Sequence, residues 1–115
     1  MKTDNNFIIY IEQEYVEWVW DRRDKSNTVV IVRDLDWFKN NGELFNLVQN
    51  IRTNPDWYNQ SGWLPESTQA KLEMYNPLVM SKMFLLNDAA ILDPFNSTSL
   101  VWVDGGITNT VHEGY

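Results

Sequence analysis

The sequence contains no cysteine, which excludes a disulfide framework, a thiolate metal site and a cysteine nucleophile. Basic residues are also few, since nine lysines and arginines stand against sixteen aspartates and glutamates, giving a net charge of −7. This acidic balance argues against nucleic acid and anionic membrane surfaces as partners. The one histidine, His112, stands next to Glu113 near the C-terminus. A frayed terminus is the favoured interpretation of this pair, and a metal or acid–base site is the alternative.

Long hydrophobic runs are missing as well. The first apolar stretch is short and is cut by Glu12, so it does not fit a signal peptide. The apolar run over residues 76–92 contains Lys82 and Asp88 and falls short of a bilayer span. From these two stretches we predict no membrane span and a cytoplasmic location.

The sequence also has no catalytic Ser/His/Asp arrangement, P-loop or GxGxxG fingerprint.

What the sequence does have is a globular composition. Hydrophobic residues make up 43% of its 115 residues and aromatic residues 14%, including six tryptophans that we expect to pack in the core. We find no internal repeat, no low-complexity segment and no linker. The length and this uniformity predict a single domain spanning residues 1–115.

The hydrophobic pattern predicts alternating strands and helices. Runs of β-prone apolar residues predict strands buried on both faces, at residues 7–11, 28–32 and 100–103. Apolar residues at helical spacing predict helices at residues 14–23, 42–52, 66–75 and 77–92, with Asn76 as the N-cap of the last, and residues 56–65 read as a loop. This order predicts an α/β layered sandwich with a largely parallel sheet. Because three strands leave two open edges, we expect a protein partner or an oligomer to cover them.

Asp104 follows the third predicted strand and precedes two glycines. A carboxylate held at a strand end is suited to bind a divalent cation and substrate phosphates, and the glycines would let a ligand approach the backbone. Asp-Gly-Gly is also ordinary turn chemistry, and from these residues alone the turn is favoured.

Lys82 is the basic residue of an otherwise largely apolar helix. It lies one position away from a face marked by Val79, Met83, Leu86 and Ala90. A lysine that extends to solvent from the edge of a buried helix is the favoured interpretation. The alternative is a cation that reaches a ligand phosphate, or an aspartate in the same cleft.

Asp34 and Asp36 follow the second predicted strand, and Arg33 precedes them. Carboxylates at this edge of a parallel sheet are candidates for holding a nucleotide base or ribose. A solvated loop, or an N-cap of a helix that contains Trp37, is the favoured reading.

Four stretches of the sequence resemble a known family. YNPLVMSKMFLLNDA (75–89) and DPFNSTSLVWVDGGIT (93–108) resemble the HtrL/YibB family, which is related to lipopolysaccharide-modifying and glycan-building loci. FIIYIEQEYVEWVWDRR (7–23) and NTVVIVRDL (27–35) resemble the strand–helix–strand segment of that family. The resemblance covers about residues 7–111. By this resemblance the chain looks like a divergent glycosyltransferase of the GT-A type.

The resemblance implies a partial GT-A, nucleotide-diphospho-sugar transferase fold and a role in polysaccharide biosynthesis. The activity that this resemblance implies is transfer of a sugar from a nucleotide-sugar donor to a glycan acceptor. Asp104 looks like the first acid of a motif that holds Mn²⁺ or Mg²⁺ on the donor diphosphate, which makes it a metal ligand and catalytic residue. Lys82 would be a second catalytic residue in the donor cleft, close enough to pair with Asp104. Asp34, Gly105 and Gly106 would be further donor contacts.

The sequence departs from the family pattern in two respects. Gly106 stands where a second acid is expected, and 115 residues are fewer than a GT-A domain contains, so we expect an incomplete domain. The alternative function is therefore a non-catalytic scaffold or interaction module derived from the same fold, in which exposed aromatic residues form a partner surface.

Overall fold

The computed structural model describes residues 4–41 and 43–105. Its sheet consists of β1 (Phe7–Ile11) and β2 (Thr28–Val32), which run parallel in a register from Phe7 opposite Thr28 to Ile11 opposite Val32. The bounds of both strands are those predicted, and the architecture is α/β as expected. The strands are half-buried for most of their length rather than buried on both faces, and the sheet in the described part of the chain has two strands.

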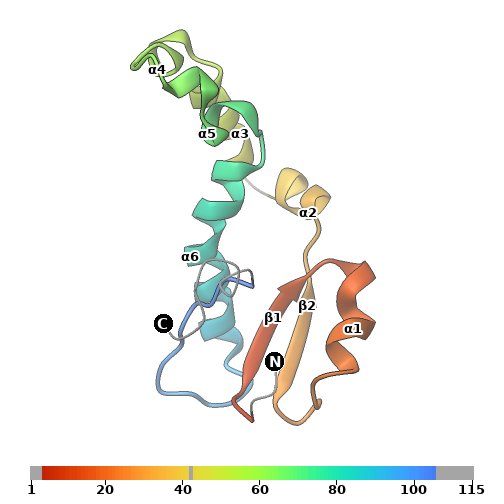
Figure 1. The fold of residues 1–115 in the computed structure, drawn as a ribbon. Helices are drawn as coiled ribbons and strands as arrows, with labels where there is room; N and C mark the ends of the chain where they lie inside the picture. The colour runs from red at the N-terminus through yellow and green to blue at the C-terminus, as the bar shows by residue number, and fades with distance from the viewer. Residues whose placement is uncertain (1–3, 42, 106–115) are drawn as a thin grey trace, which may run out of the picture.

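The helix in the connection between the two strands ends earlier than the predicted 14–23. It is made of η1 (Gln13–Tyr15) and α1 (Val16–Trp20), and α1 lies beside the sheet in Figure 1. Val19 of α1 is fully buried. Removing this apolar side chain from water stabilises the β–α–β unit.

Arg23 ties the end of this connection to the start of both strands. The residue is buried, its Nε donates to Thr28 Oγ1 at 2.9 Å, and its Nη2 donates to the Asn5 carbonyl at 2.5 Å. The guanidinium also lies 4.7 Å from the centroid of the Phe7 ring. A buried cation with these partners fixes where both strands begin.

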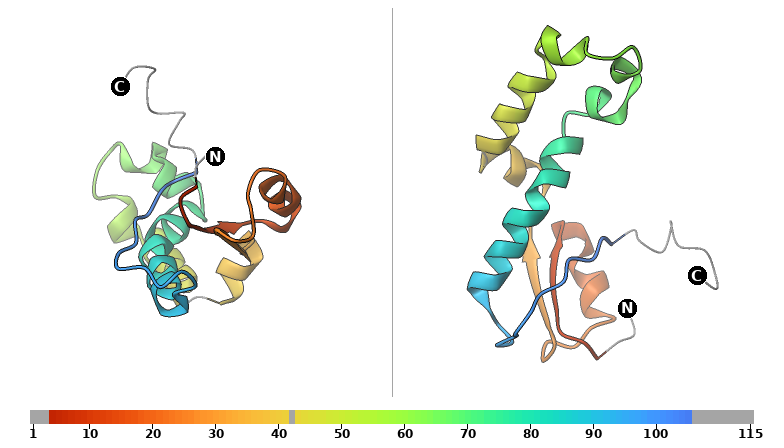
Figure 2. Two further views of the ribbon diagram at one scale, coloured as in Figure 1. Left: turned by 90° about the horizontal axis from the view of Figure 1, so that it is seen from below. Right: turned by 90° about the vertical axis from the view of Figure 1, so that its left-hand side faces the viewer.

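A helical arm follows β2 and projects away from the sheet (Figures 1 and 2). Its elements are α2 (Leu35–Asn40), α3 (Glu43–Arg52), α4 (Pro55–Tyr58), η2 (Leu64–Glu66) and α5 (Thr68–Lys71). The radius of gyration is 17.1 Å, compared with about 13 Å for a compact domain of roughly 100 residues. The arm therefore makes the molecule elongated.

Two sequence predictions within the arm are wrong. The loop expected over residues 56–65 contains α4, because the Asn54 side chain accepts from the Asp56 N–H and Pro55 starts the helix. The helix expected over residues 66–75 is reduced to α5, which begins where Ser67 accepts from the Ala70 N–H. Side-chain caps decide both boundaries, and an apolar pattern does not reveal them.

The longest helix is α6 (Tyr75–Leu92), which ends where predicted. It begins before the expected Asn76 cap, because a proline is tolerated anywhere in a first turn, where the backbone N–H has no intrahelical partner. Its buried face is a row four residues apart, made of Pro77, Ser81, Leu85 and Ala89. The face marked by Val79 and Met83 in the sequence is exposed instead, because the sheet is on the other side. The Tyr10 hydroxyl of β1 joins the two elements by donating to the Leu85 carbonyl at 2.9 Å.

Residues 93–105, here called the tail segment, turn back at the end of α6 and run beside that helix (Figures 1 and 2). Asp93 adopts the left-handed conformation that ends the helix, with φ 41°. The strand predicted over residues 100–103 does not form, and Val101 is 82% exposed. The physical reason is that no strand in the described part of the chain pairs with this segment, and an extended apolar run needs such a partner.

Candidate functional site

Lys82 and Asp104 form an ion pair between α6 and the tail segment. The Lys82 Nζ lies 2.9 Å from Asp104 Oδ1 and donates to Oδ2 at 3.1 Å. The side chains are 35% and 55% exposed, respectively. The pairing of these two residues, predicted from the sequence, is confirmed, although 22 positions separate them.

Trp102 is a third member of the site, and the sequence analysis missed it. Its Nε1 donates to Asp104 Oδ1 at 2.7 Å. This hydrogen bond and then the Lys82 ammonium hold the pKa of Asp104 below its ordinary value. The available signal was spacing, because residues two apart on an extended segment point to the same side.

The rotation of α6 about its axis determines where Lys82 points. Its neighbour Ser81 is buried and donates to the Pro77 carbonyl, and Pro77 is itself fully buried. Lys82 is therefore placed at the border between the buried face and solvent. The alternative drawn from the sequence, a lysine that reaches an aspartate, is the one the structure shows, and α6 is exposed over much of its surface rather than buried.

The turn after α6 brings Asp104 back to the helix. The Asp93 carboxylate accepts from the Ser97 N–H at 3.0 Å, which fixes the direction in which the tail segment leaves. Beyond this turn, the described part of the tail is held to α6 by the Lys82–Asp104 pair. Side-chain charges therefore take the place of backbone pairing here.

The donor set around Asp104 does not fit a divalent cation. Mn²⁺ and Mg²⁺ need several oxygen ligands, whereas both carboxylate oxygens of Asp104 already accept from N–H donors, one of them a cationic ammonium. Within residues 4–41 and 43–105, no three aspartates, glutamates or histidines gather closely enough to bind a metal ion. Gly106, His112 and Glu113 lie outside the described residues.

Asp34 lies at the start of α2, where its carboxylate accepts from the Trp37 N–H at 2.7 Å. The N-cap reading favoured in the sequence is therefore confirmed. The described structure records no hydrogen bond or ion pair from Asp34 to Lys82 or Asp104. Its role as a donor contact stays a prediction.

Gly105 directly follows the ion pair. A Cβ added at this position would meet no atom within 4 Å, so protein contacts do not require a glycine there. Among the described residues, none occupies the place of that Cβ.

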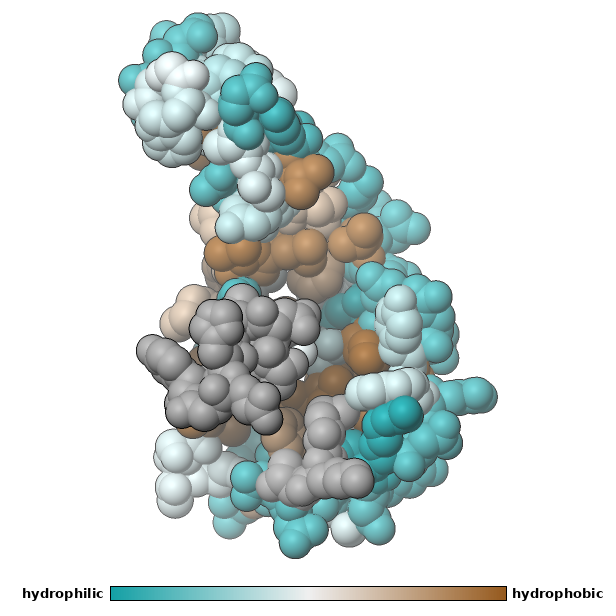
Figure 3. Space-filling model, viewed as in Figure 1, coloured by the Kyte–Doolittle hydropathy of each residue, from teal (hydrophilic) through white to brown (hydrophobic). Residues whose placement is uncertain are grey.

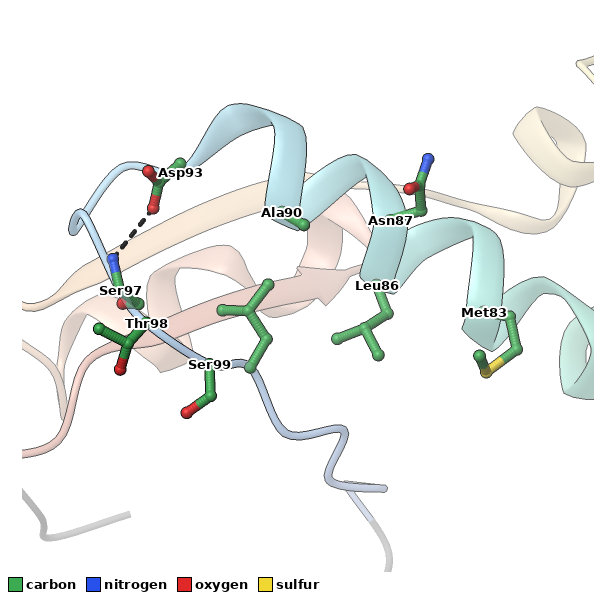
Figure 4. Close-up of a pocket in the computed structure, with 9 residues that line it drawn as sticks. Met83, Leu86, Asn87, Ala90, Asp93, Ser97, Thr98 and Ser99 are labelled. Atoms are coloured by element: carbon green, nitrogen blue, oxygen red, sulfur yellow. Dashed lines mark hydrogen bonds between the residues drawn. The ribbon is translucent and has the colours of Figure 1, made fainter.

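A groove of about 470 Å³ lies between the last turns of α6 and the tail segment. Figure 4 shows Met83, Leu86 and Ala90 along the helix, with Ser97, Thr98 and Ser99 on the tail opposite them. The lining combines an apolar helix with tail hydroxyl groups. Neither Lys82 nor Asp104 belongs to it, so the ion pair lies outside this groove.

Apolar side chains also gather across the middle of the face drawn in Figure 3. Several exposed apolar residues belong to α6, with Met83 72%, Phe84 63% and Ile91 76% exposed. Exposed apolar surface of this extent is typical of interaction surfaces. Even so, no helix in the described residues is both long and apolar enough to cross a membrane.

Comparisons with known proteins return no match: no family model, no curated protein and no solved structure is similar to this chain.

Proposed function

We propose that the chain binds a nucleotide sugar and belongs functionally with GT-A glycosyltransferases, which transfer a sugar from such a donor to a glycan acceptor. The observation that carries this proposal is the Lys82–Asp104 ion pair. The two residues come from the two stretches with the most specific resemblance, and that resemblance expects both at the donor site. The parallel β1–α1–β2 unit also supports the proposal.

The charges at this site are suited to an anionic ligand. Lys82 is the only basic residue in α6 and in the described tail segment, so it provides the positive charge for a phosphate. No described residue lies within 4 Å of a Cβ placed at Gly105, which supports room for a ligand there. A divalent cation would supply Lewis-acid stabilisation of the leaving diphosphate, but the donor set does not fit one. Asp104 therefore acts in this proposal through Lys82.

Thermal unfolding in the presence of nucleotide sugars tests the proposal. UDP-glucose, UDP-N-acetylglucosamine and GDP-mannose, each at millimolar concentration, are added with and without Mn²⁺. At least one of them is expected to raise the melting temperature, because a ligand that binds only the folded state stabilises it. Absence of a shift with all of them in both buffers would contradict the proposal.

The second candidate function is a non-catalytic scaffold or interaction module. The exposed apolar residues of α6 favour it, since a helix that is apolar on all sides is normally buried. Sedimentation velocity separates the two candidates when read together with the thermal shifts. A chain that self-associates and responds to no nucleotide sugar fits the scaffold.

A further inference from the structure

The contacts of Asp104 conflict with the metal ion that a GT-A resemblance implies. One carboxylate oxygen accepts from Trp102 Nε1 at 2.7 Å and lies 2.9 Å from the Lys82 Nζ, and the other accepts from that Nζ at 3.1 Å. A cation at this carboxylate would compete with the indole N–H and the ammonium for its oxygens and would lie beside a like charge. Both effects cost free energy.

The same contacts hold Lys82 ready for an anion. The ammonium carries three N–H donors, and about a third of the side chain remains open to solvent. The Trp102 N–H donates to Asp104, and its partial positive charge offsets part of the carboxylate's negative charge. The Asp104 carboxylate therefore repels an incoming phosphate less than a carboxylate without this hydrogen bond would. Asp104 also restricts the long lysine side chain, which lowers the entropy lost when a phosphate binds.

Resting on the proposed function, we propose that Lys82 binds the diphosphate of the nucleotide sugar without a divalent cation, with Asp104 and Trp102 as positioning residues. Lys82, which belongs to α6, supplies the positive charge that a metal ion would bring. Asp104 orients the ammonium, and Trp102 orients Asp104. Donor binding is therefore independent of divalent metal.

Isothermal titration of the full chain tests this directly. UDP-glucose, UDP-N-acetylglucosamine and GDP-mannose are each titrated in excess EDTA and again in Mn²⁺. For a probe that binds, we expect the two dissociation constants to agree within about threefold, a difference well under the tenfold change that one ordinary interaction makes. Binding only in Mn²⁺ would overturn this inference and leave the proposed function intact. Binding in neither buffer would overturn the proposed function itself.

Two substitutions at the site separate a lysine site from a metal site. Lys82→Gln is expected to weaken binding about tenfold or more, the usual loss for a hydrogen bond to a charged group. Asp104→Asn keeps the shape of the side chain and leaves Lys82 cationic, so binding should weaken less than in Lys82→Gln. A metal site predicts the reverse order, and that order would overturn the inference.

The chain offers a matched control in a second ion pair. Lys39 Nζ lies 2.8 Å from Glu73 Oε1, and the side chains are 37% and 51% exposed, close to the values for Lys82 and Asp104. Lys39→Gln is expected to leave nucleotide-sugar binding unchanged. An equal loss in both lysine variants would mean that net charge, rather than the site, governs binding, and would overturn the inference.

Mn²⁺ alone tests whether a divalent cation binds at Asp104. In an NMR spectrum, Mn²⁺ broadens signals close to where it binds. We expect no selective broadening of the Trp102 indole N–H at Mn²⁺ concentrations that saturate ordinary metal sites. Selective broadening at Trp102 would place the cation at Asp104 and refute the inference.

Discussion

The β1–α1–β2 unit and the corner formed by α6 and the tail segment are held together by different interactions. In the first, parallel backbone hydrogen bonds, the buried Val19 and the buried Arg23 fix the strands. In the second, the partly exposed ion pair between Asp104 and Lys82 holds the tail to α6, and Trp102, in the tail itself, donates to Asp104. Backbone pairing resists change, whereas exposed charges exchange partners readily. The corner is therefore the part of the molecule in which a ligand can add a contact to Lys82 without disturbing backbone pairing.

Breaking the β–α–β unit should have the largest effect on stability. Arg23→Met keeps a long, unbranched side chain but removes the donors to Thr28 and Asn5. We therefore expect the free energy of unfolding to fall by about 2–3 kcal/mol. Urea unfolding followed by circular dichroism measures it. Arg22→Met is the control, because exposed Arg22 donates to the Trp18 carbonyl and stacks on the Trp18 ring at the surface, and its loss should stay within about 1 kcal/mol. Equal losses in both variants would contradict the structural role of Arg23.

The hydrogen bond between the two regions should have an intermediate effect. Tyr10→Phe removes the donor to the Leu85 carbonyl and is expected to cost about 1 kcal/mol. Burial and then the Asp88 carboxylate raise the pKa of Tyr10. The folded state therefore holds this stabilisation below the unfolded pKa of about 10 and loses it as the pH rises through the higher folded value.

Unfolding measured at neutral pH and again above pH 10 checks this expectation. Wild type and Tyr10→Phe should converge at high pH. A difference that stays constant across this range would show that the hydroxyl is not the cause.

Releasing the tail segment should change local protection with little effect on global unfolding. Trp102→Phe removes the indole donor that positions Asp104 against Lys82, so the ion pair that holds the tail weakens and the described part of the tail should exchange its amide hydrogens faster. The urea midpoint should stay at the wild-type value. Hydrogen exchange read by mass spectrometry measures the tail, with β1 as internal reference. If β1 also loses protection, the tail is part of the core and the comparison of the two regions is wrong.

The smallest effect is on proton binding at the corner. The pKa of Asp104 is lowered, first by the Trp102 hydrogen bond and then by Lys82. The pair therefore stabilises the folded state above the unfolded pKa of about 3.9, and this contribution is lost as the pH falls through the lower folded value. The NMR shift of the Asp104 carboxyl carbon should titrate below the usual value in wild type and closer to it in Trp102→Phe. A midpoint at or above the usual value in wild type would contradict the hydrogen bond.

The sequence predicts the two regions to different degrees, for physical reasons. The bounds of β1 and β2 follow from continuous apolar runs, and such runs form strands because each finds the other as a partner. The run at residues 100–103 looks the same, but it has no partner among the described residues and stays unpaired. Pairing is a property of the whole fold, so local pattern alone does not decide it.

At the candidate site, too, one contact was predicted from the sequence and another was not. The pairing of Lys82 with Asp104 was expected, because a resemblance placed both at one site and opposite charges attract. The Trp102 contact was missed because tryptophans were assigned to the core as a class. The α2 and α4 helices depend on caps by Asp34 and Asn54, which also read as ordinary loop residues.

The most direct test of the central claim is a titration of the full chain with a nucleotide sugar, followed by the indole N–H signals in an NMR spectrum. The sequence has six tryptophans, so the experiment contains its own controls. If the ligand binds at the Lys82–Asp104 pair, the signal of Trp102 should move furthest, because its N–H donates to Asp104. A saturable shift at another tryptophan with Trp102 unmoved, or no shift at any of them, would contradict the account.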